Sequence, residues 1–349
     1  MTPVRAMVLA AGLGTRLRPI TEQIPKPLAP VIAKPLIEQA FANLAEAGIS
    51  EVIVNTHHLR ETMRRWLRDG PIFGHRVTVS EEKETLLGTG GGIKKAKWFL
   101  AKSDPFVVLN GDTLSRPDLR AALESHRVSG ALATLVLRED PRAARYGMVS
   151  ADESGRVVDI AGRAGAPGPR GGVFIGAHVV SPEIFDHMPS SDAFCIVNDV
   201  YVPLLRAGDE RIRAIFTTRP FFDLGTVEDF AEAQFDLMRE GLKDFPHLYS
   251  GLVQKKRHVY VAASVKISRS AAVVGPAAIC AGVNIGENAQ IGPNAVIGAG
   301  VTIGDGARVT RSIIWPGARV NTDETLANVV RMPTLDATIP RTREPLFNG

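Results

Sequence analysis

The sequence predicts an α/β domain built on a mostly parallel sheet, followed by a parallel β-helix. Residues 1–245 alternate short apolar runs with patterns typical of helices, which indicates βαβ units. From about residue 260 onward, apolar residues recur at steps of six, which is the repeat of a parallel β-helix. We therefore expect a linker over 246–259, a β-helix over 260–325 and a surface tail over 326–349.

The first domain contains five apolar runs that we expect to form strands, at residues 7–11, 52–54, 77–79, 106–109 and 132–137. Between the first two runs, apolar residues return at three- and four-residue steps from Leu36 to Ala47, and Gly48 follows. This pattern predicts an amphipathic helix that stops at a glycine.

The predicted β-helix repeats two positions. A smaller apolar residue lies two places before each residue of an inward-facing series, and glycine often follows that series. Val320 comes one residue early, so we expect the register to slip there. Three repeats would make one triangular coil, and each coil needs its neighbours to bury its core. The inward series is Ile267, Val273, Ile279, Ile285, Ile291, Ile297, Ile303, Val309 and Trp315.

Composition excludes several classes of protein. The chain has 349 residues, of which 45% are hydrophobic and 22% charged, as in ordinary globular proteins of about two domains. Cys195 and Cys280 are the two cysteines, which excludes a disulfide framework and a thiolate zinc site. The N-terminal apolar run 6–12 is too short for a membrane span or a signal-peptide core, so we expect a cytoplasmic protein without membrane contact. The net charge of +4 comes without a basic, aromatic-rich block, and we expect no nucleic-acid binding.

The most informative motif follows the first predicted strand. Gly12 and Gly14 would let the backbone turn tightly and bring its N–H groups close to a phosphate. Arg16 and Lys26 add positive charge. A dinucleotide fingerprint would need glycine where Leu17 stands, and the Gly-Lys-Ser/Thr of a P-loop is absent from this motif. The motif therefore predicts a phosphate-binding loop of another kind.

From Gly12 to Lys26 the residues read Gly-x-Gly-Thr-Arg-Leu-x-Pro-x-Thr-x-x-x-Pro-Lys. This resembles the signature of the sugar-1-phosphate nucleotidylyltransferases, and the wider resemblance covers about residues 4–240. Mannose-1-phosphate guanylyltransferases commonly combine such a Rossmann-like domain with a hexapeptide-repeat β-helix, for which the resemblance implies a left-handed coil. It also implies that a sugar-1-phosphate oxygen attacks the α-phosphorus of a nucleoside triphosphate, that pyrophosphate leaves and that Mg²⁺ assists.

Two aspartates are the expected metal ligands. Asp112 follows a strand and Gly111, and an acid at the carboxyl end of a parallel strand faces the ligand crevice. Taken alone it could instead cap a helix. Leu-Asn-Gly-Asp resembles the family's metal-binding motif, and the motif around Asp223, Phe-Asp-Leu-Gly-Thr, resembles the second one. The resemblance thus implies a catalytic set of Arg16, Lys26, Asp112 and Asp223.

The nucleotide site is expected to use a second glycine-rich run, residues 84–92. Gly88 and Thr89 match the family's base-binding Leu-Gly-Thr-x-Gly loop, whereas the lysines at 94, 95 and 97 fit a solvated helix face. The resemblance implies that the nucleotide contacts Leu9, Ala10, Ala11, Gly12, Gly14, Thr15, Arg16, Gly88 and Thr89.

The expected sugar pocket departs from the common pattern. Gly147, in Tyr-Gly-x-Val, and Arg163, where many relatives carry lysine, are the implied sugar-phosphate contacts. Gly162 stands where the family has glutamate, and Phe174 stands where it has asparagine. Base and sugar therefore stay open, as does the role of the pair 198–199.

These observations favour an enzyme that joins a nucleoside triphosphate to a sugar-1-phosphate with Mg²⁺, and GTP with mannose-1-phosphate is the leading pair. The alternatives are a uridylyltransferase for N-acetylmuramic acid 1-phosphate, a catalytically silent nucleotide-sugar sensor and a purely structural solenoid protein. Acyltransfer on the solenoid would need a histidine base, and none follows His258. A homo-oligomer formed through the β-helix is a further expectation.

Overall fold

A computed structural model describes residues 3–70, 72–140, 143, 147–165, 167–240 and 243–340. The chain forms two compact units. The first contains the residues up to Leu13, Ile24–Leu28 and Leu36–Phe221. The second contains Gly14–Gln23, Ala29–Pro35 and the residues from Phe222 onward.

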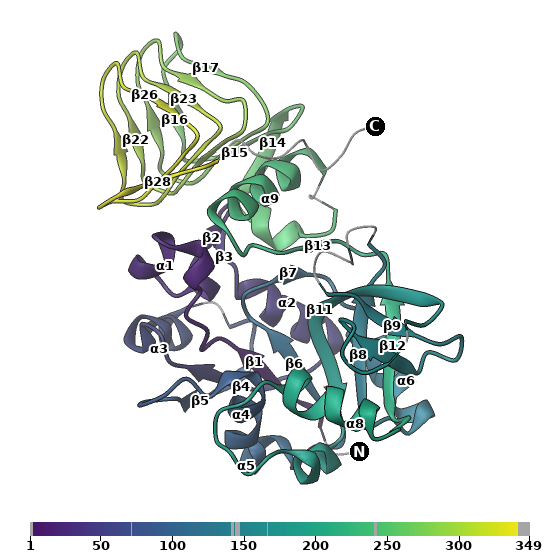
Figure 1. Cartoon of the computed structure of the whole chain (residues 1–349). Coiled ribbons are helices and arrows are strands. Elements are labelled where there is room, and N and C mark those ends of the chain that lie inside the picture. Colours follow the sequence, from purple (N-terminus) through teal and green to yellow (C-terminus); the bar gives the residue numbers. More distant parts are fainter. Residues whose placement is uncertain are drawn as a thin grey trace. The chain divides into compact units, whose positions relative to one another are not determined.

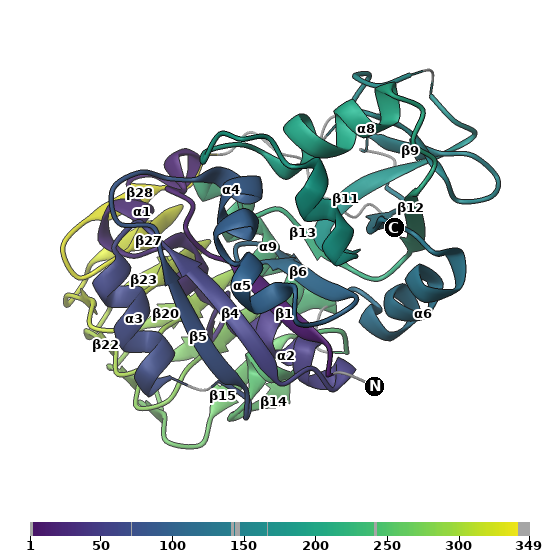
Figure 2. The same cartoon turned by 90° about the horizontal axis from the view of Figure 1, so that it is seen from below.

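The first unit is built on a nine-stranded sheet (Figures 1 and 2). Its N-terminal strands are parallel: β1 (Arg5–Leu9) lies between β4 (Glu51–Thr56) and β6 (Phe106–Asn110), and β5 (Arg76–Glu81) pairs with β4. β11 (Arg170–Val180) continues the sheet antiparallel to β6. The remaining strands are β8 (Ala133–Arg138), β9 (Val149–Ala151), β10 (Val157–Ile160) and β12 (Ile212–Thr217).

The predicted α/β architecture is confirmed, and each of the five predicted strands overlaps an observed one. The antiparallel direction of β11 relative to β6 is a feature that the apolar runs did not indicate. It separates the parallel strands β5, β4, β1 and β6, whose carboxyl ends form one edge, from a second parallel pair, β8 and β12.

Helices cover both faces of this sheet because its strands are apolar on both sides. Ala6 and Val8 of β1 pack in a cluster with α2, α3 and α6, while Met7 packs on the opposite side with α4, α5 and α8. The predicted glycine stop is also confirmed: Gly48 has a φ of 78° and caps α2. The helices are α2 (Glu38–Ala47), α3 (Arg60–Asp69), α4 (Gly88–Lys95), α5 (Lys97–Leu100), α6 (Leu119–Ser129) and α8 (Val202–Arg206).

The second unit consists mainly of short strands that form three sheets, and the chain passes from one sheet to the next in successive turns (Figure 1). Parallel partners such as Ile267, Ile285 and Ile303 lie eighteen residues apart, or three of the predicted repeats. These parallel strands are compatible with the predicted β-helix. The unit also contains α1 (Ile20–Gln23), β2 (Pro30–Val31), β3 (Lys34–Pro35) and α9 (Val227–Glu240).

The strands of these sheets continue to Thr338, beyond the predicted boundary at residue 325. They are β14 (Leu252–Lys256), β15 (Val259–Ala262), β16 (Lys266–Ile267), β17 (Ala272–Val273), β18 (Ala277–Ile279), β19 (Asn284–Ile285), β20 (Gln290–Ile291), β21 (Ala295–Ile297), β22 (Thr302–Ile303), β23 (Arg308–Thr310), β24 (Ser312–Ile314), β25 (Arg319–Val320), β26 (Thr325–Ala327), β27 (Val329–Arg331) and β28 (Asp336–Thr338).

The register of the repeat slips earlier than predicted. Ile297 pairs with Ile314, not with Trp315, so the step from Val309 is one residue short. Ile314 joins the apolar core of the sheets, whereas the Trp315 ring lies 6.5 Å from the ring of Phe230 in α9. The assignment of Trp315 to the inward series was therefore wrong, because this side chain packs against a helix instead.

No helix in the described part of the chain combines the length and the apolarity needed to cross a membrane.

Candidate active site

A cavity of about 300 Å³ opens in the first unit where β1, β4 and β6 end. The carboxyl ends of parallel strands are the usual place for ligands in such sheets. Eight predicted site residues, from segments far apart in the sequence, line it. The lining is Leu9, Ala10, Ala11, Gly12, Lys26, Pro27, Asn55, Leu86, Gly88, Thr89, Asn110 and Asp112.

Lys26 and Asp112 form an ion pair at this cavity. The Lys26 Nζ donates to Asp112 Oδ2 at 3.0 Å, and the lysine side chain is only 6% exposed while that of the aspartate is 41% exposed. Gly111 sets this geometry, because a Cβ there would lie 2.9 Å from Val8 and 3.0 Å from the carbonyl oxygen of Leu9. One side of Asp112 thus faces a buried cation and the other faces the cavity.

Two buried polar residues that the sequence analysis missed connect the loops around the cavity. Asn55 Oδ1 accepts from the Ala10 N–H at 2.8 Å, and its Nδ2 donates to Glu82 Oε1 at 2.7 Å. Glu82 Oε2 accepts from the Leu87 N–H at 2.8 Å. The available signal was that Asn55 directly follows the predicted strand 52–54 and that Glu82 comes three residues after the predicted strand 77–79. These hydrogen bonds connect the loop that follows β1, at Ala10, to the glycine-rich loop, at Leu87.

The glycine-rich run begins helix α4, and part of it serves packing. A Cβ on Gly90 would come within 2.2 Å of the Phe194 ring, and one on Gly91 within 2.0 Å of the Asp192 carbonyl oxygen. The Thr89 hydroxyl accepts from the Ile196 N–H at 3.0 Å. Packing therefore accounts for the glycines at 90 and 91, whereas Gly88 and Thr89 line the cavity as expected for a ligand loop.

The second unit holds the remaining predicted phosphate and metal residues. Gly14 adopts a left-handed conformation with a φ of 62° and starts a 3-10 turn, Thr15–Leu17. Arg16 Nη1 lies 3.7 Å from Asp223 Oδ2, and a Cβ on Gly225 would lie 2.7 Å from the same nitrogen. Leu17 is fully buried, which explains an apolar residue where a dinucleotide fingerprint has glycine.

The expected sugar contacts lie on other loops of the first unit. Arg163 donates to Asn198 Oδ1, which gives Asn198 a partner that the sequence had left open. Asp159 accepts the N–H groups of Gly162, Ala164 and Gly165 at 2.6, 2.8 and 3.1 Å. Burial works to raise the pKa of Asp159, but these backbone donors outweigh it and lower that pKa. The loop that carries Arg163 is thus held by three hydrogen bonds to one carboxylate.

Gly147 is the other expected sugar contact. It has a φ of 84°, which favours glycine. Tyr146, the preceding residue of the same Tyr-Gly-x-Val motif, lies outside the described residues. Gly147 and Arg163 are not part of the cavity lining given above.

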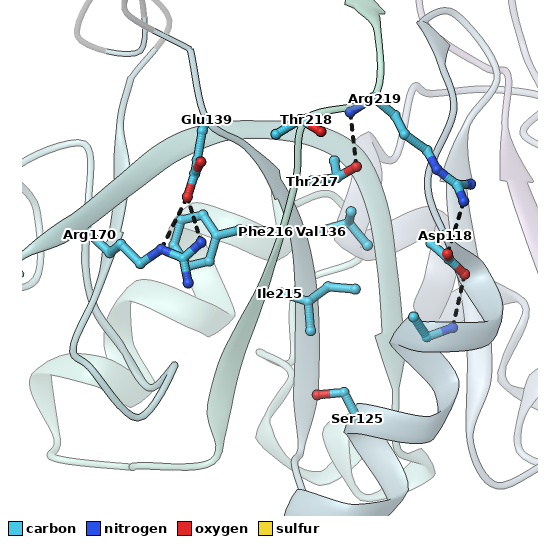
Figure 3. A pocket seen from close by; sticks show the side chains of 11 residues that line it. Asp118, Ser125, Val136, Glu139, Arg170, Ile215, Phe216, Thr217, Thr218 and Arg219 are labelled. Carbon is cyan, nitrogen blue, oxygen red and sulfur yellow. Dashed lines mark hydrogen bonds and ion pairs between the residues drawn. The ribbon is translucent and has the colours of Figure 1, made fainter. Parts of the chain in front are cut away.

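A second cavity, of about 480 Å³, is lined by α6, β8 and β12 of the first unit (Figure 3). Arg170 pairs with Glu139 and stacks over Phe216 at 3.9 Å, while Arg219 pairs with Asp118 at 3.0 Å. The charged side chains that line this cavity thus form ion pairs with one another, and no predicted site residue lines it.

Among the described residues, no three His, Cys, Asp or Glu side chains gather as a metal-binding group. Asp112 belongs to the first unit and Asp223 to the second.

Two family models and several curated relatives match this chain. The family model described as nucleotidyl transferase matches residues 5–240, and the model described as the GMPPB C-terminal domain matches residues 273–330. A UTP–glucose-1-phosphate uridylyltransferase from Synechocystis is 30% identical over 304 residues, which is 79% of this chain and 78% of the relative. A mannose-1-phosphate guanylyltransferase from Mycobacterium tuberculosis is 35% identical over 247 residues, 70% of this chain and 67% of the relative.

Among solved structures, HddC from Yersinia pseudotuberculosis complexed with GMP-PN has 27% sequence identity and a TM-score of 0.56, over 67% of this chain and 99% of that one. The first family model spans most of the chain and contains the cavity lined by Lys26 and Asp112. The chain therefore belongs to the nucleotidyl transferase family, among enzymes whose curated members are sugar-1-phosphate nucleotidyltransferases.

Proposed function

We propose that this protein transfers a nucleotidyl group from a nucleoside triphosphate to a sugar-1-phosphate, with GTP and mannose-1-phosphate as the leading pair. The observation that carries the proposal is the cavity at the ends of β1, β4 and β6, where the predicted phosphate and base loops meet Lys26 and Asp112. The guanylyltransferase relative and the GMPPB C-terminal match favour the leading pair.

The reaction needs alignment and charge neutralisation more than covalent help. A phosphate oxygen of the sugar-1-phosphate forms a bond to the α-phosphorus, the bond from that phosphorus to the bridging oxygen breaks, and pyrophosphate leaves with the electron pair. No general base is required, because the attacking phosphate is already anionic at neutral pH. Lys26 and Arg16 would neutralise charge on the phosphates, and the backbone around Gly12 would hold them.

Asp112 fits a role as a ligand of Mg²⁺. Its carboxylate is partly exposed at the cavity, already holds one cation through Oδ2, and its Oδ1 has no partner among the described residues. Magnesium is usually held by one or two carboxylates together with phosphate oxygens and water. Asp112 and Asp223 would hold the ion, which when bound would supply positive charge to the phosphates.

The proposal extends to the sugar and to the second unit. Gly147 and Arg163 would contact the sugar-phosphate, with Asp159 holding the loop of Arg163 in place.

The eighteen-residue register of the parallel strands supports a β-helix, and its left-handed sense and a homo-oligomer formed through it remain part of the proposal.

The test is pyrophosphate release with Mg²⁺, crossing GTP, UTP, dTTP, ATP and CTP with a panel of sugar-1-phosphates. The panel includes mannose-, glucose- and N-acetylmuramic acid 1-phosphate. We expect turnover with one pair, and a loss of about 100-fold or more in kcat for Asp112→Asn. The exposed Asp69→Asn is the matched control and should keep full turnover.

Turnover with UTP and an N-acetylated sugar-1-phosphate would select the uridylyltransferase alternative. The Synechocystis relative supports the UTP part of this alternative, and a relative from Neisseria meningitidis named N-acetylmuramate alpha-1-phosphate uridylyltransferase supports the sugar. Nucleotide binding without turnover for any pair would contradict the proposal and favour a sensor.

A further inference from the structure

Each cation predicted to bind phosphate is paired with a carboxylate predicted to bind metal. In the first unit Lys26 Nζ lies 3.0 Å from Asp112 Oδ2. In the second unit Arg16 Nη1 lies 3.7 Å from Asp223 Oδ2. Each of these four groups therefore has a partner of opposite charge within the chain itself.

The Lys26 pair is the stronger of the two, because the ammonium is buried and its backbone is fixed. Lys26 lies in a turn between two prolines, where the Leu28 N–H donates to the Pro25 carbonyl oxygen at 2.8 Å. Within the described part of the chain, the Lys26 Nζ donates its hydrogen bond to Asp112 Oδ2. A buried charge needs such a partner, so the ammonium cannot leave Asp112 without another anion to receive it.

A divalent cation on Asp112 Oδ1 would lie close to this ammonium and be repelled by it, and the cation could use Oδ2 only by displacing the ammonium. A triphosphate in the cavity would remove the conflict, since its oxygens can receive Lys26 and leave both carboxylate oxygens to the metal.

We propose that Lys26 is an internal counter-ion that blocks metal binding at Asp112 until a triphosphate takes it over. This rests on the proposed function for the identity of the ligands. By linkage, metal and triphosphate must then increase each other's affinity by the same factor.

Arg16 repeats the arrangement in a looser form. Its side chain is 68% exposed and rests against Gly225, where any Cβ would meet the guanidinium. Because an exposed pair at this distance is weak, we assign most of the effect to Lys26.

The experiment measures binding of Mn²⁺, as a stand-in for Mg²⁺, to the full chain without nucleotide, from the electron paramagnetic resonance signal of the free ion. Lys26→Met should bind Mn²⁺ about tenfold more tightly than the unmodified protein, within the usual range of coupling between sites. The gain should vanish in Lys26→Met/Asp112→Asn. Lys26→Arg, which keeps the charge, should bind as weakly as the unmodified protein.

Lys102→Met, which removes an exposed lysine beside Trp98, is the control for net charge and should not change Mn²⁺ binding. Equal Mn²⁺ affinity in Lys26→Met and the unmodified protein would overturn the inference, and so would an equal gain in Lys102→Met.

Because Lys26 is buried, its variants are compared by circular dichroism and thermal unfolding. A second measurement does not depend on them: in EDTA, Asp112→Asn should bind GTP more tightly than the unmodified protein, as Lys26 is then unpaired. Unchanged GTP binding there would also contradict the inference. Failure of the proposed function is read separately, from absent turnover in the unmodified protein, whatever the Mn²⁺ affinities are.

Discussion

Glu82 is a buried carboxylate that joins the two loops of the cavity, through Asn55 on one side and the Leu87 N–H on the other. We expect Glu82→Gln to weaken nucleotide binding, because the new amide group can accept only one of these two bonds. An unmet buried donor costs about 1–3 kcal/mol, so the free energy of unfolding should fall by that amount. Thermal unfolding and the KM for the triphosphate would measure both effects. Glu84→Gln, on an exposed neighbour, should change neither.

Two buried histidines predict how stability depends on pH. Burial lowers the pKa of His178 to about 3, and burial together with the charge of Arg127 lowers that of His126 to about 4. The unfolded chain takes up these protons near pH 6.5 and the folded chain does not, so the stabilisation is complete above pH 6.5 and is lost as the pH falls towards 4. Each histidine contributes a slope of about 1.4 kcal/mol per pH unit in that window.

Urea unfolding between pH 7.5 and 4.5 would measure this slope. His126→Gln should be less stable at pH 7.5, where it loses bonds to Thr134 and Ser181, but its stability should fall less on acidification. Identical slopes for the two proteins would show that this histidine takes up its proton in the folded state.

Residues of the candidate site could be predicted from the sequence only where they belong to a recognisable motif. Lys26, Asp112, Gly88 and Thr89 stand in recognisable patterns, and the structure brings them to one cavity. Glu82 and Asn55 carry no such pattern. Their positions near the ends of predicted strands were only a weak signal, because the burial of each side chain depends on the neighbouring strands and loops of the fold.

At the scale of elements, α4 is tied to the segment around Phe194, and this dependence gives a prediction. Gly91→Ala would place a methyl group 2.0 Å from the Asp192 carbonyl oxygen, and backbone atoms yield less readily than a side chain. We expect a loss of about 1–3 kcal/mol in the free energy of unfolding, as for other overpacked sites. The KM for the triphosphate should rise, since Gly88 and Thr89 belong to the same helix. Unchanged stability would mean that the segment moves away freely.

The repeat of the second unit illustrates what a periodic pattern can and cannot predict. The step of six gives the inward residues of most strands, because each strand has the same surroundings in the next turn. The step of six fails at Trp315, because the repeat that begins after Val309 is five residues long and places Ile314 at the inward position. Close by, Arg311 forms an ion pair with Glu232 and Trp315 packs on Phe230, both from α9. A contact with a helix so distant in sequence leaves no mark in the period.

For the whole molecule, the order of an α/β part and a repeated β part was predictable, but the grouping of segments was not. Gly14–Gln23 and Ala29–Pro35 interrupt the first unit and belong to the second. Ile32 shows why: its N–H donates to Gln234 Oε1 at 2.9 Å, and its carbonyl oxygen lies 3.7 Å from Cys280 Sγ. Such pairs join residues more than 200 positions apart, which sequence patterns do not reveal.

This grouping predicts that the C-terminal strands stabilise the phosphate loop. A chain ending at residue 245 would lose the Cys280 contact to Ile32 and expose Phe230, which is fully buried in the intact chain. We expect a lower Tm, binding of an apolar dye and a higher KM for the triphosphate, because Thr15 and Arg16 belong to the unit that is cut. Restoring residues 246–340 on the same chain should reverse all three effects. A truncated protein with the Tm and KM of the intact chain would mean that residues 14–23 keep their conformation without the strands, and that the repeats serve another purpose than holding this loop.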